Sequence, residues 1–103
     1  MDMGEVKEYT FEELCRIVGA IAAAYGMRRV YLFGSRARGD NKADSDYDFF
    51  VVPDDDCGMF RLAGFFGKLQ EALGDVDVVC DDPAEKDDFT KRISEDLRLV
   101  YEA

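Results

Sequence analysis

The feature that most constrains this chain is a fixed spacing between a small-residue turn and a pair of aspartates. The apolar run Arg29–Phe33 leads directly into Gly34-Ser35, and a second apolar run, Asp46–Val52, begins after ten further residues. β-Branched and aromatic residues fill both runs, which predicts two strands joined by an exposed polar loop. A turn of small residues can wrap a phosphate, and aspartates can hold a cation. One short segment therefore carries both kinds of group.

The two aspartates, Asp46 and Asp48, stand at alternate positions of the second run. Alternate residues of a strand point to one face, so their Cα atoms should be about 7 Å apart with both carboxylates on the same side. Two carboxylates so placed can converge on one cation or on a pair of cations. The alternative is that both are solvated acids, because the chain holds 15 aspartates and other Asp-x-Asp patterns occur in it.

The turn and the loop after it carry the candidate phosphate-binding groups. Gly34 allows a ligand to approach the backbone closely, and the hydroxyl of Ser35 adds a donor. Arg36, Arg38 and Lys42 are cations on the same loop of an otherwise acidic chain, and they could neutralise a triphosphate. The alternative is an ordinary turn followed by solvated basic residues.

The rest of the chain alternates between helical and strand patterns. Apolar residues at helical spacing, with Thr10 and Glu13 as a capping box, predict a helix over Thr10–Tyr25. The pattern continues with a helix over about Met59–Leu73, a strand over Asp75–Cys80 and a last helix from about Ala84, with Phe89, Ile93, Leu97 and Val100 on one face. This order predicts a single α/β (α+β) domain over residues 1–103, a small mixed sheet flanked by helices.

Composition narrows the chemistry. Histidine is absent, which excludes Ser-His-Asp and Cys-His catalysis and every histidine-based metal site. Carboxylates would have to bind any metal, and they favour a hard cation, Mg²⁺ above all. The net charge of −10 argues against nucleic acid as a direct partner, because basic side chains supply most of the affinity for phosphate backbones.

The remaining sequence signals concern the compartment. No segment is long and apolar enough to span a membrane, and the acidic N-terminal residues do not resemble a signal peptide. Cys15, Cys57 and Cys80 are an odd number of cysteines at scattered spacings, unlike a metal knuckle or a disulfide framework. We expect a cytoplasmic protein with reduced thiols and no membrane partner. Cys15 and Cys80 should be small buried residues, and Cys57 should be more exposed.

The small-residue turn and the aspartate pair together are far more specific than either motif alone. The string Phe-Gly-Ser-Arg-Ala-Arg-Gly, followed by Ser-Asp-Tyr-Asp, resembles the minimal nucleotidyltransferases of the DNA polymerase β-like superfamily. The resemblance implies that superfamily's fold and a third carboxylate on a later strand. Asp77 between valines fits this position, and Asp75 on the same strand face is the alternative.

The resemblance also implies a mechanism. Asp46, Asp48 and Asp77 would hold two Mg²⁺ ions, with Asp77 close enough to accept the proton of an attacking hydroxyl. Gly34 and Ser35 would cradle the phosphates of ATP, the substrate, and a set of cations would assist them: Arg36, Arg38 or Lys42.

The implied reaction is transfer of AMP from ATP to a hydroxyl. Larger members of the superfamily hold their acceptor with a second helical domain, and we expect no such domain in these 103 residues. The acceptor must then be held by another protein or a second copy of the chain, or be a protein itself. Minimal nucleotidyltransferases are commonly paired with a HEPN-type toxin, a ribonuclease, and act as its antitoxin by adenylylating a tyrosine. Two alternatives stay open: a non-catalytic module that neutralises a partner by forming a complex with it, with nucleotide binding only regulatory, and an acidic interaction domain in which the motif is coincidental.

Overall fold

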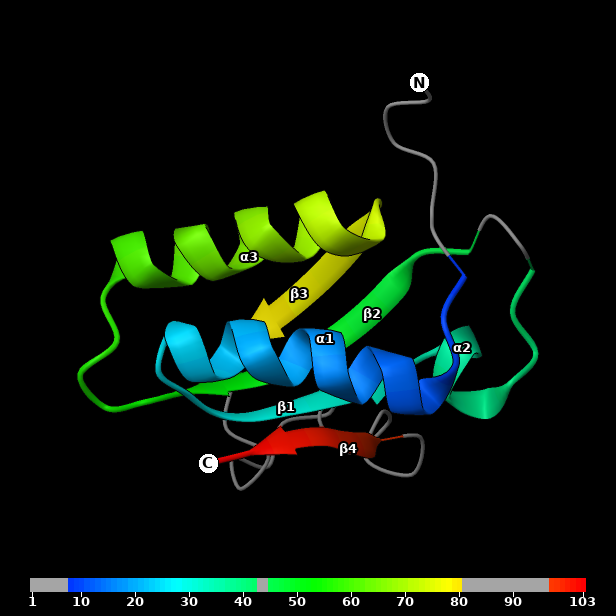
Figure 1. The fold of residues 1–103 in the computed structure, drawn as a ribbon, viewed down its shortest axis with the longest axis horizontal. Helices are drawn as coiled ribbons and strands as arrows, with labels where there is room; N and C mark the ends of the chain where they lie inside the picture. The colour runs from blue at the N-terminus through cyan, green and yellow to red at the C-terminus, as the bar shows by residue number, and fades with distance from the viewer. Residues whose placement is uncertain (1–7, 43–44, 81–96) are drawn as a thin grey trace.

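A four-stranded mixed sheet forms the framework of the fold, and two helices pack on one of its faces (Figure 1). The structure is a computed structural model that describes residues 8–42, 45–80 and 97–103. The strands are β1 (Met27–Phe33), β2 (Tyr47–Pro53), β3 (Val76–Cys80) and β4 (Arg98–Glu102). They lie in the order β3-β2-β1-β4. Only β2 and β3 are parallel; β1 is antiparallel to both of its neighbours. The predicted mixed sheet is confirmed.

Helix α1 (Phe11–Ala24) begins at the predicted capping box. The Glu13 N–H donates to the Thr10 hydroxyl at 3.1 Å, and the Thr10 N–H donates to the Glu13 carboxylate at 2.9 Å. These two bonds satisfy backbone donors that the first helical turn leaves without partners. Within the described residues, no helix is both long and apolar enough to cross a membrane.

Helix α3 (Met59–Leu73) has the predicted bounds in spite of two internal glycines, each of which lowers helix stability. One of them is explained by packing. A Cβ at Gly64 would lie 2.7 Å from the Tyr25 ring, so the missing side chain makes room for that ring at the end of α1. The two helices approach each other closely at this point, and together they cover the sheet.

The core lies between this face of the sheet and the two helices. Its buried side chains include Leu14, Val18 and Ala22 from α1, Phe65, Leu69 and Leu73 from α3, and Tyr47, Phe49 and Val51 from β2. Strand β2 is buried on both faces, because Phe50 on the opposite face is also fully buried and meets the Tyr31 ring edge-on. A central strand of this kind fixes the position of any polar residue at its start.

The C-terminal element differs from the sequence prediction. The prediction of a helix that reaches Val100 is wrong at its C-terminal end, because residues 98–102 form strand β4, which pairs with β1. Val100 is buried in the core cluster, and the Arg98 guanidinium lies 3.7 Å from the centre of the Phe11 ring. Backbone pairing with an open strand edge outweighed the helical spacing of a few apolar residues. The earlier part of that predicted helix, from Ala84, lies outside the described residues.

Candidate active site

The turn after β1 has the backbone that its sequence predicts. Gly34 has φ 78° and ψ −158°, a conformation essentially restricted to glycine, and it begins the single helical turn α2 (Ser35–Arg38). The N–H groups of Ala37 and Arg38 both donate to the Gly34 carbonyl at 3.1 Å. A Cβ at residue 34 would collide with the Asp48 carboxylate and lie 3.3 Å from its Cγ. Glycine is therefore required both by the backbone and by the close approach of Asp48.

The sheet places two carboxylates side by side. Asp48 on β2 is in register with Phe33 on β1 and, on its other side, with Asp77 on β3. Asp77 is therefore the later aspartate that is in register with Asp48, whereas Asp75 precedes β3 by one residue. The Asp75 carbonyl accepts the Tyr47 N–H at 3.2 Å and so helps to align the two strands.

The electrostatics of this pair are unfavourable without a cation. Burial, as the largest cause, together with the charges of Asp77 and Asp46 raises the pKa of Asp48 from 3.8 to about 6, against a smaller opposing effect of Arg38. Asp46 itself is exposed and precedes β2 by one residue. Like charges so close destabilise each other unless a cation or donors compensate.

These oxygen ligands suit a hard divalent cation such as Mg²⁺. Asp48 and Asp77 form the centre of the group, and Asp46 lies near enough to affect the charge of Asp48. Over residues 8–42, 45–80 and 97–103, no three carboxylates or thiols converge tightly enough to enclose an ion. The chemistry of the donors fits the ion, and the site is a pair with a third carboxylate at its margin.

Arg36 and Arg38 have different surroundings, although both were predicted to contact the nucleotide. The side chain of Arg36 is only 5% exposed and makes two bonds to the Glu8 carboxylate, at 3.1 and 3.2 Å. Its Nε donates to the Ser45 carbonyl at 2.9 Å, and its guanidinium lies 4.1 Å from the centre of the Tyr47 ring. Arg36 therefore ties the polar loop to the start of β2.

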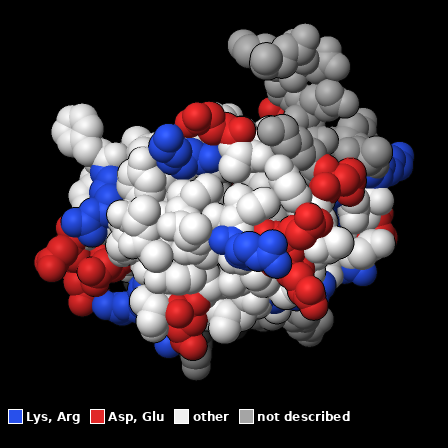
Figure 2. All heavy atoms as spheres, viewed as in Figure 1, with Lys and Arg blue, Asp and Glu red and all other residues white. Residues whose placement is uncertain are grey.

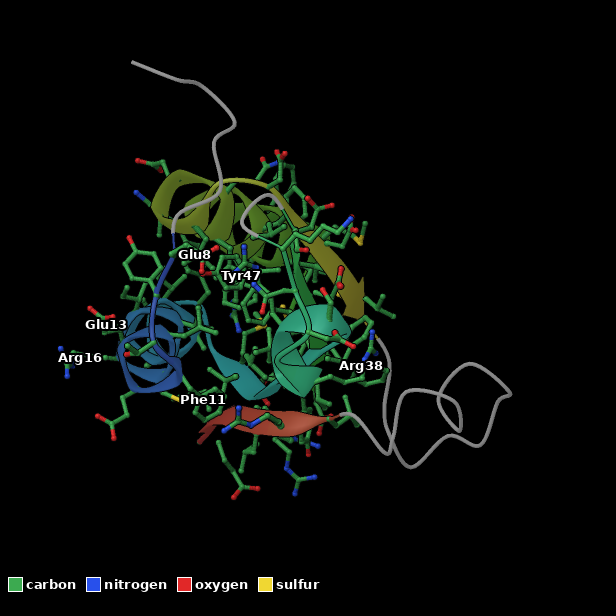
Figure 3. The ribbon with its side chains drawn as sticks, turned by 90° about the vertical axis from the view of Figure 1, so that its right-hand side faces the viewer. Glu8, Phe11, Glu13, Arg16, Arg38 and Tyr47 are labelled. Carbon is green, nitrogen blue, oxygen red and sulfur yellow. The ribbon has the colours of Figure 1, made fainter. Side chains whose placement is uncertain are left out.

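Arg38 points elsewhere. Figure 3 shows it on the other side of α2 from Glu8 and Tyr47. Its side chain is about half exposed, forms an ion pair with Asp40 at 3.3 Å, and is near enough to Asp48 to lower its pKa. Of the cations predicted to meet phosphate, Arg38 is the one for which these observations support a role at the carboxylates. Lys42 is exposed, and its backbone N–H donates to the Ser45 hydroxyl at 2.9 Å.

Sequence reasoning missed the supports behind the turn. Tyr47 is buried, its hydroxyl accepts the Tyr9 N–H at 3.3 Å, and its ring stacks on Phe49 at 6.2 Å. Strand alternation was the available signal, because a residue between two outward aspartates points inward. No comparable signal marks Glu8, whose pairing with Arg36 depends on how the chain folds back.

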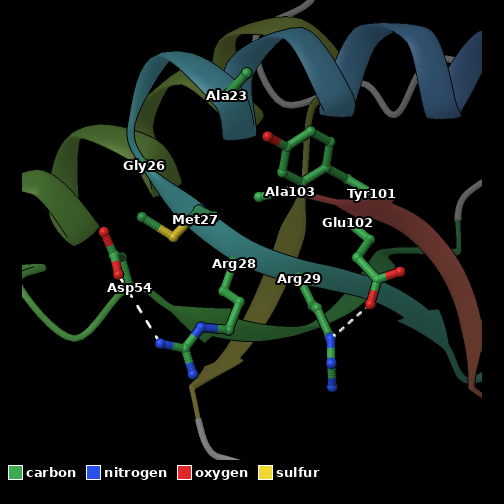
Figure 4. Close-up of a pocket in the computed structure, with 9 residues that line it drawn as sticks. All are labelled: Ala23, Gly26, Met27, Arg28, Arg29, Asp54, Tyr101, Glu102 and Ala103. Atoms are coloured by element: carbon green, nitrogen blue, oxygen red, sulfur yellow. Dashed lines mark hydrogen bonds and ion pairs between the residues drawn. The ribbon is translucent and has the colours of Figure 1, made fainter.

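A cavity of about 530 Å³ lies at the opposite end of β1 from the Gly34 turn (Figure 4). Its cations are already paired: Arg28 lies 3.2 Å from Asp55, and Arg29 lies 2.9 Å from Glu102. Figure 2 likewise shows basic side chains scattered among acidic ones on the face it presents. The cavity lacks the cluster of carboxylates and the glycine turn, so the candidate active site is the one at Asp48.

Comparisons with solved structures found the same fold in several chains. A minimal nucleotidyltransferase aligns with a TM-score of 0.68 and 25% identity over 89% of this chain and 97% of that chain. A chain of a toxin–antitoxin complex with AMP-PNP aligns at 0.65 and 21% identity, over 89% and 73%. A chain from tri-AMPylated Shewanella oneidensis HEPN toxin in complex with MNT antitoxin aligns at 0.63 and 17% identity, over 91% and 74%.

A search of curated proteins found no match. Residues 18–103, however, match the family model described as polymerase beta, nucleotidyltransferase. That match includes the glycine turn and all three aspartates of the candidate site. The chain therefore belongs to the polymerase beta nucleotidyltransferase family.

Proposed function

We propose that this protein transfers AMP from ATP to a hydroxyl group of a partner protein, a tyrosine of a HEPN-type toxin, and so acts as an antitoxin. The observation that carries the proposal is the position of Asp48 and Asp77, side by side next to the Gly34 turn. Two similar structures support the choice of substrates. One is a complex with AMP-PNP, and the other contains a tri-AMPylated HEPN toxin with its MNT antitoxin.

The positions of the carboxylates and the family of the chain support the proposed roles. Asp48 and Asp77 would hold two Mg²⁺ ions together with Asp46. Bound Mg²⁺ supplies charge neutralisation for the triphosphate and lowers the pKa of the attacking hydroxyl. Asp77, on the exposed surface of β3, can accept the proton of that hydroxyl.

The remaining groups position the nucleotide. The side chain missing at Gly34 lets the Asp48 carboxylate approach this turn, and the Ser35 hydroxyl offers a donor to phosphate oxygens. Arg38 brings positive charge to the same side of the turn as Asp48. Catalysis then depends mainly on positioning and charge stabilisation, as in phosphoryl transfer generally.

The experiment is an intact-mass measurement. The purified chain is incubated with ATP, Mg²⁺ and the HEPN-type protein encoded beside it, and both proteins are weighed. We expect a mass gain of one or more AMP units on the partner, lost in Asp48→Asn and retained in Asp56→Asn. The second variant is the matched control, because Asp56 is an exposed aspartate away from the site. Calorimetry with AMP-PNP and Mg²⁺ should show weaker binding by Arg38→Ala.

The same experiment separates the alternative function. Inhibition of the partner with no change in mass, and with full inhibition by Asp48→Asn, would replace the catalytic proposal with neutralisation by binding alone. Absence of Mg²⁺-dependent nucleotide binding would reject the catalytic proposal and favour the third interpretation, an acidic interaction domain in which the motif is coincidental.

A further inference from the structure

Two cysteines that are far apart in the sequence lie near the C-terminal ends of the parallel strands β2 and β3. Cys57 is in the loop after β2, directly before Gly58, the N-cap residue of α3. Cys80 is the last residue of β3. Because β2, α3 and β3 form a parallel crossover unit, the loop that leaves β2 and the C-terminal end of β3 lie at the same end of the sheet. Cys80 is in register with Val51, near the end of β2.

Both cysteines also line one cavity, of about 370 Å³. The loop after β2 turns back there, since the Cys57 N–H donates to the Asp54 carbonyl at 2.9 Å. Cys57 is half-buried against the core, whereas Cys80 is exposed, contrary to the sequence prediction that it is buried. Reagents in solution can therefore reach this cavity and the Cys80 thiol.

The two thiols share the surroundings of this cavity. Burial, and then the neighbouring Cys57, raise the pKa of the Cys80 thiol. The third cysteine has other neighbours. Cys15 lies on α1, where burial raises its pKa and the charge of Arg98 on β4 lowers it. Strands β3 and β4 are the opposite edges of the sheet, so Cys15 is separated from the other two cysteines.

We propose that Cys57 and Cys80 are a dithiol modification site, which low-molecular-weight disulfides such as oxidised glutathione convert into an intramolecular disulfide. This inference goes beyond the proposed nucleotidyl transfer. The bond would join the loop before α3 to β3, the strand that carries Asp77.

The chemistry balances with glutathione disulfide as the oxidant. One protein thiolate attacks the glutathione disulfide, which forms a mixed disulfide and releases one glutathione thiolate. The second protein thiolate then attacks the protein sulfur of that mixed disulfide and releases the second glutathione. The two protein thiols are oxidised, one glutathione disulfide is reduced to two thiols, and the two protons pass from protein to glutathione.

The test uses the whole chain, oxidised glutathione and peptide mapping without reduction. Tryptic cleavage after Arg61 and Lys68 separates the two cysteines, so a crosslinked peptide pair identifies the bond. We expect a mass decrease of two hydrogen atoms and a Cys57–Cys80 crosslink in the wild type and in Cys15→Ser. Cys57→Ser and Cys80→Ser should each retain a glutathione adduct on the remaining cysteine of the pair.

Three results would overturn the proposal. They are a wild-type chain with stable adducts on both Cys57 and Cys80, a disulfide that includes Cys15, and a bond between two chains. The wild-type map alone distinguishes these outcomes, so the inference stays testable if a serine variant fails to fold.

Discussion

Asp48 is the residue at which burial, strand pairing and charge meet. It is the second residue of β2, whose next four residues are buried; it is in register with Asp77, and its carboxylate occupies the space that a side chain at Gly34 would fill. A hydrophobic side chain at this position would remove the repulsion between the carboxylates. Its identity is therefore explained by the proposed reaction and not by the stability of the fold.

The raised pKa of Asp48 gives a pH-dependent prediction for the metal-free protein. Its pKa is about 6 in the folded chain and 3.8 in its ordinary state, so the folded chain binds the proton more tightly. This contribution to stability is complete below about pH 4 and is lost as the pH rises through about 6. The variant Asp48→Asn has no carboxylate to ionise here and so does not lose this stability. The difference in free energy of unfolding between Asp48→Asn and the wild type should therefore shift in favour of the variant by about 1–3 kcal/mol between pH 4 and 7.

Urea denaturation in a chelating buffer, at a series of pH values, measures this advantage. Asp56→Asn serves as the control, because its side chain is exposed and away from the site. A constant difference between Asp48→Asn and wild type over the whole range would contradict the assignment of the shift to Asp48.

Two glycines with positive φ separate backbone strain from the approach of Asp48. At Gly39, with φ 84°, a Cβ would meet open space, so Gly39→Ala should cost only about 1–2 kcal/mol of backbone strain. At Gly34 a Cβ would also displace the Asp48 carboxylate. We expect Gly34→Ala to lose more free energy of unfolding than Gly39→Ala, roughly 1–3 kcal/mol more. Equal losses in urea denaturation would show that the space beside Asp48 has no energetic role.

At the scale of elements, local signals were sufficient for the helices and insufficient for the last strand. The capping box at Thr10 and the periodic apolar residues of α3 act within a few turns, and both helices match their predicted bounds closely. Strand β4 depends on pairing with β1, far away in the sequence, and its few apolar residues fit a helix or a strand equally. Propensity could not decide between them.

Helix α3 offers a matched pair of phenylalanines for testing which face is packed. Phe65 is fully buried, whereas Phe60 is 97% exposed on the same helix. Phe65→Ala should lower the free energy of unfolding by about 3–5 kcal/mol, through lost burial and a new cavity. Phe60→Ala should change it by less than about 0.5 kcal/mol. Chemical denaturation of both variants checks this, and a large loss in Phe60→Ala would show that the helix packs by another face.

At the scale of the whole molecule, the excess of negative charge is a source of repulsion. The net charge is −10, and the ion pairs Arg29–Glu102 and Lys68–Glu71 join partly exposed side chains. Exposed pairs of this kind contribute little, whereas repulsion acts over the entire surface. The protein should therefore be stabilised when salt screens its charges.

We expect the thermal unfolding midpoint to rise by several degrees when sodium chloride increases from about 50 to about 500 mM. Calorimetry measures the midpoint. A chain with Glu12→Gln and Asp56→Asn, two exposed acids, should show a smaller rise. A midpoint that falls with salt would mean that the ion pairs outweigh the repulsion.

The sequence by itself determined the features that depend on neighbouring residues. The Gly34 turn, the Asp-x-Asp strand and the helices α1 and α3 follow from local sterics, capping and hydrophobic periodicity. The order of the elements also placed Asp77 on a later strand, although Asp75 remained an alternative at that stage.

Only the tertiary structure decided which distant groups meet. Strand register places Asp77 beside Asp48, and the fold of the chain pairs Arg36 with Glu8. The crossover unit places Cys57 and Cys80 at one cavity. The physical reason is common to these cases. Register and packing arise from contacts between segments that are remote in the sequence, and a one-residue slip would send each side chain to the other face.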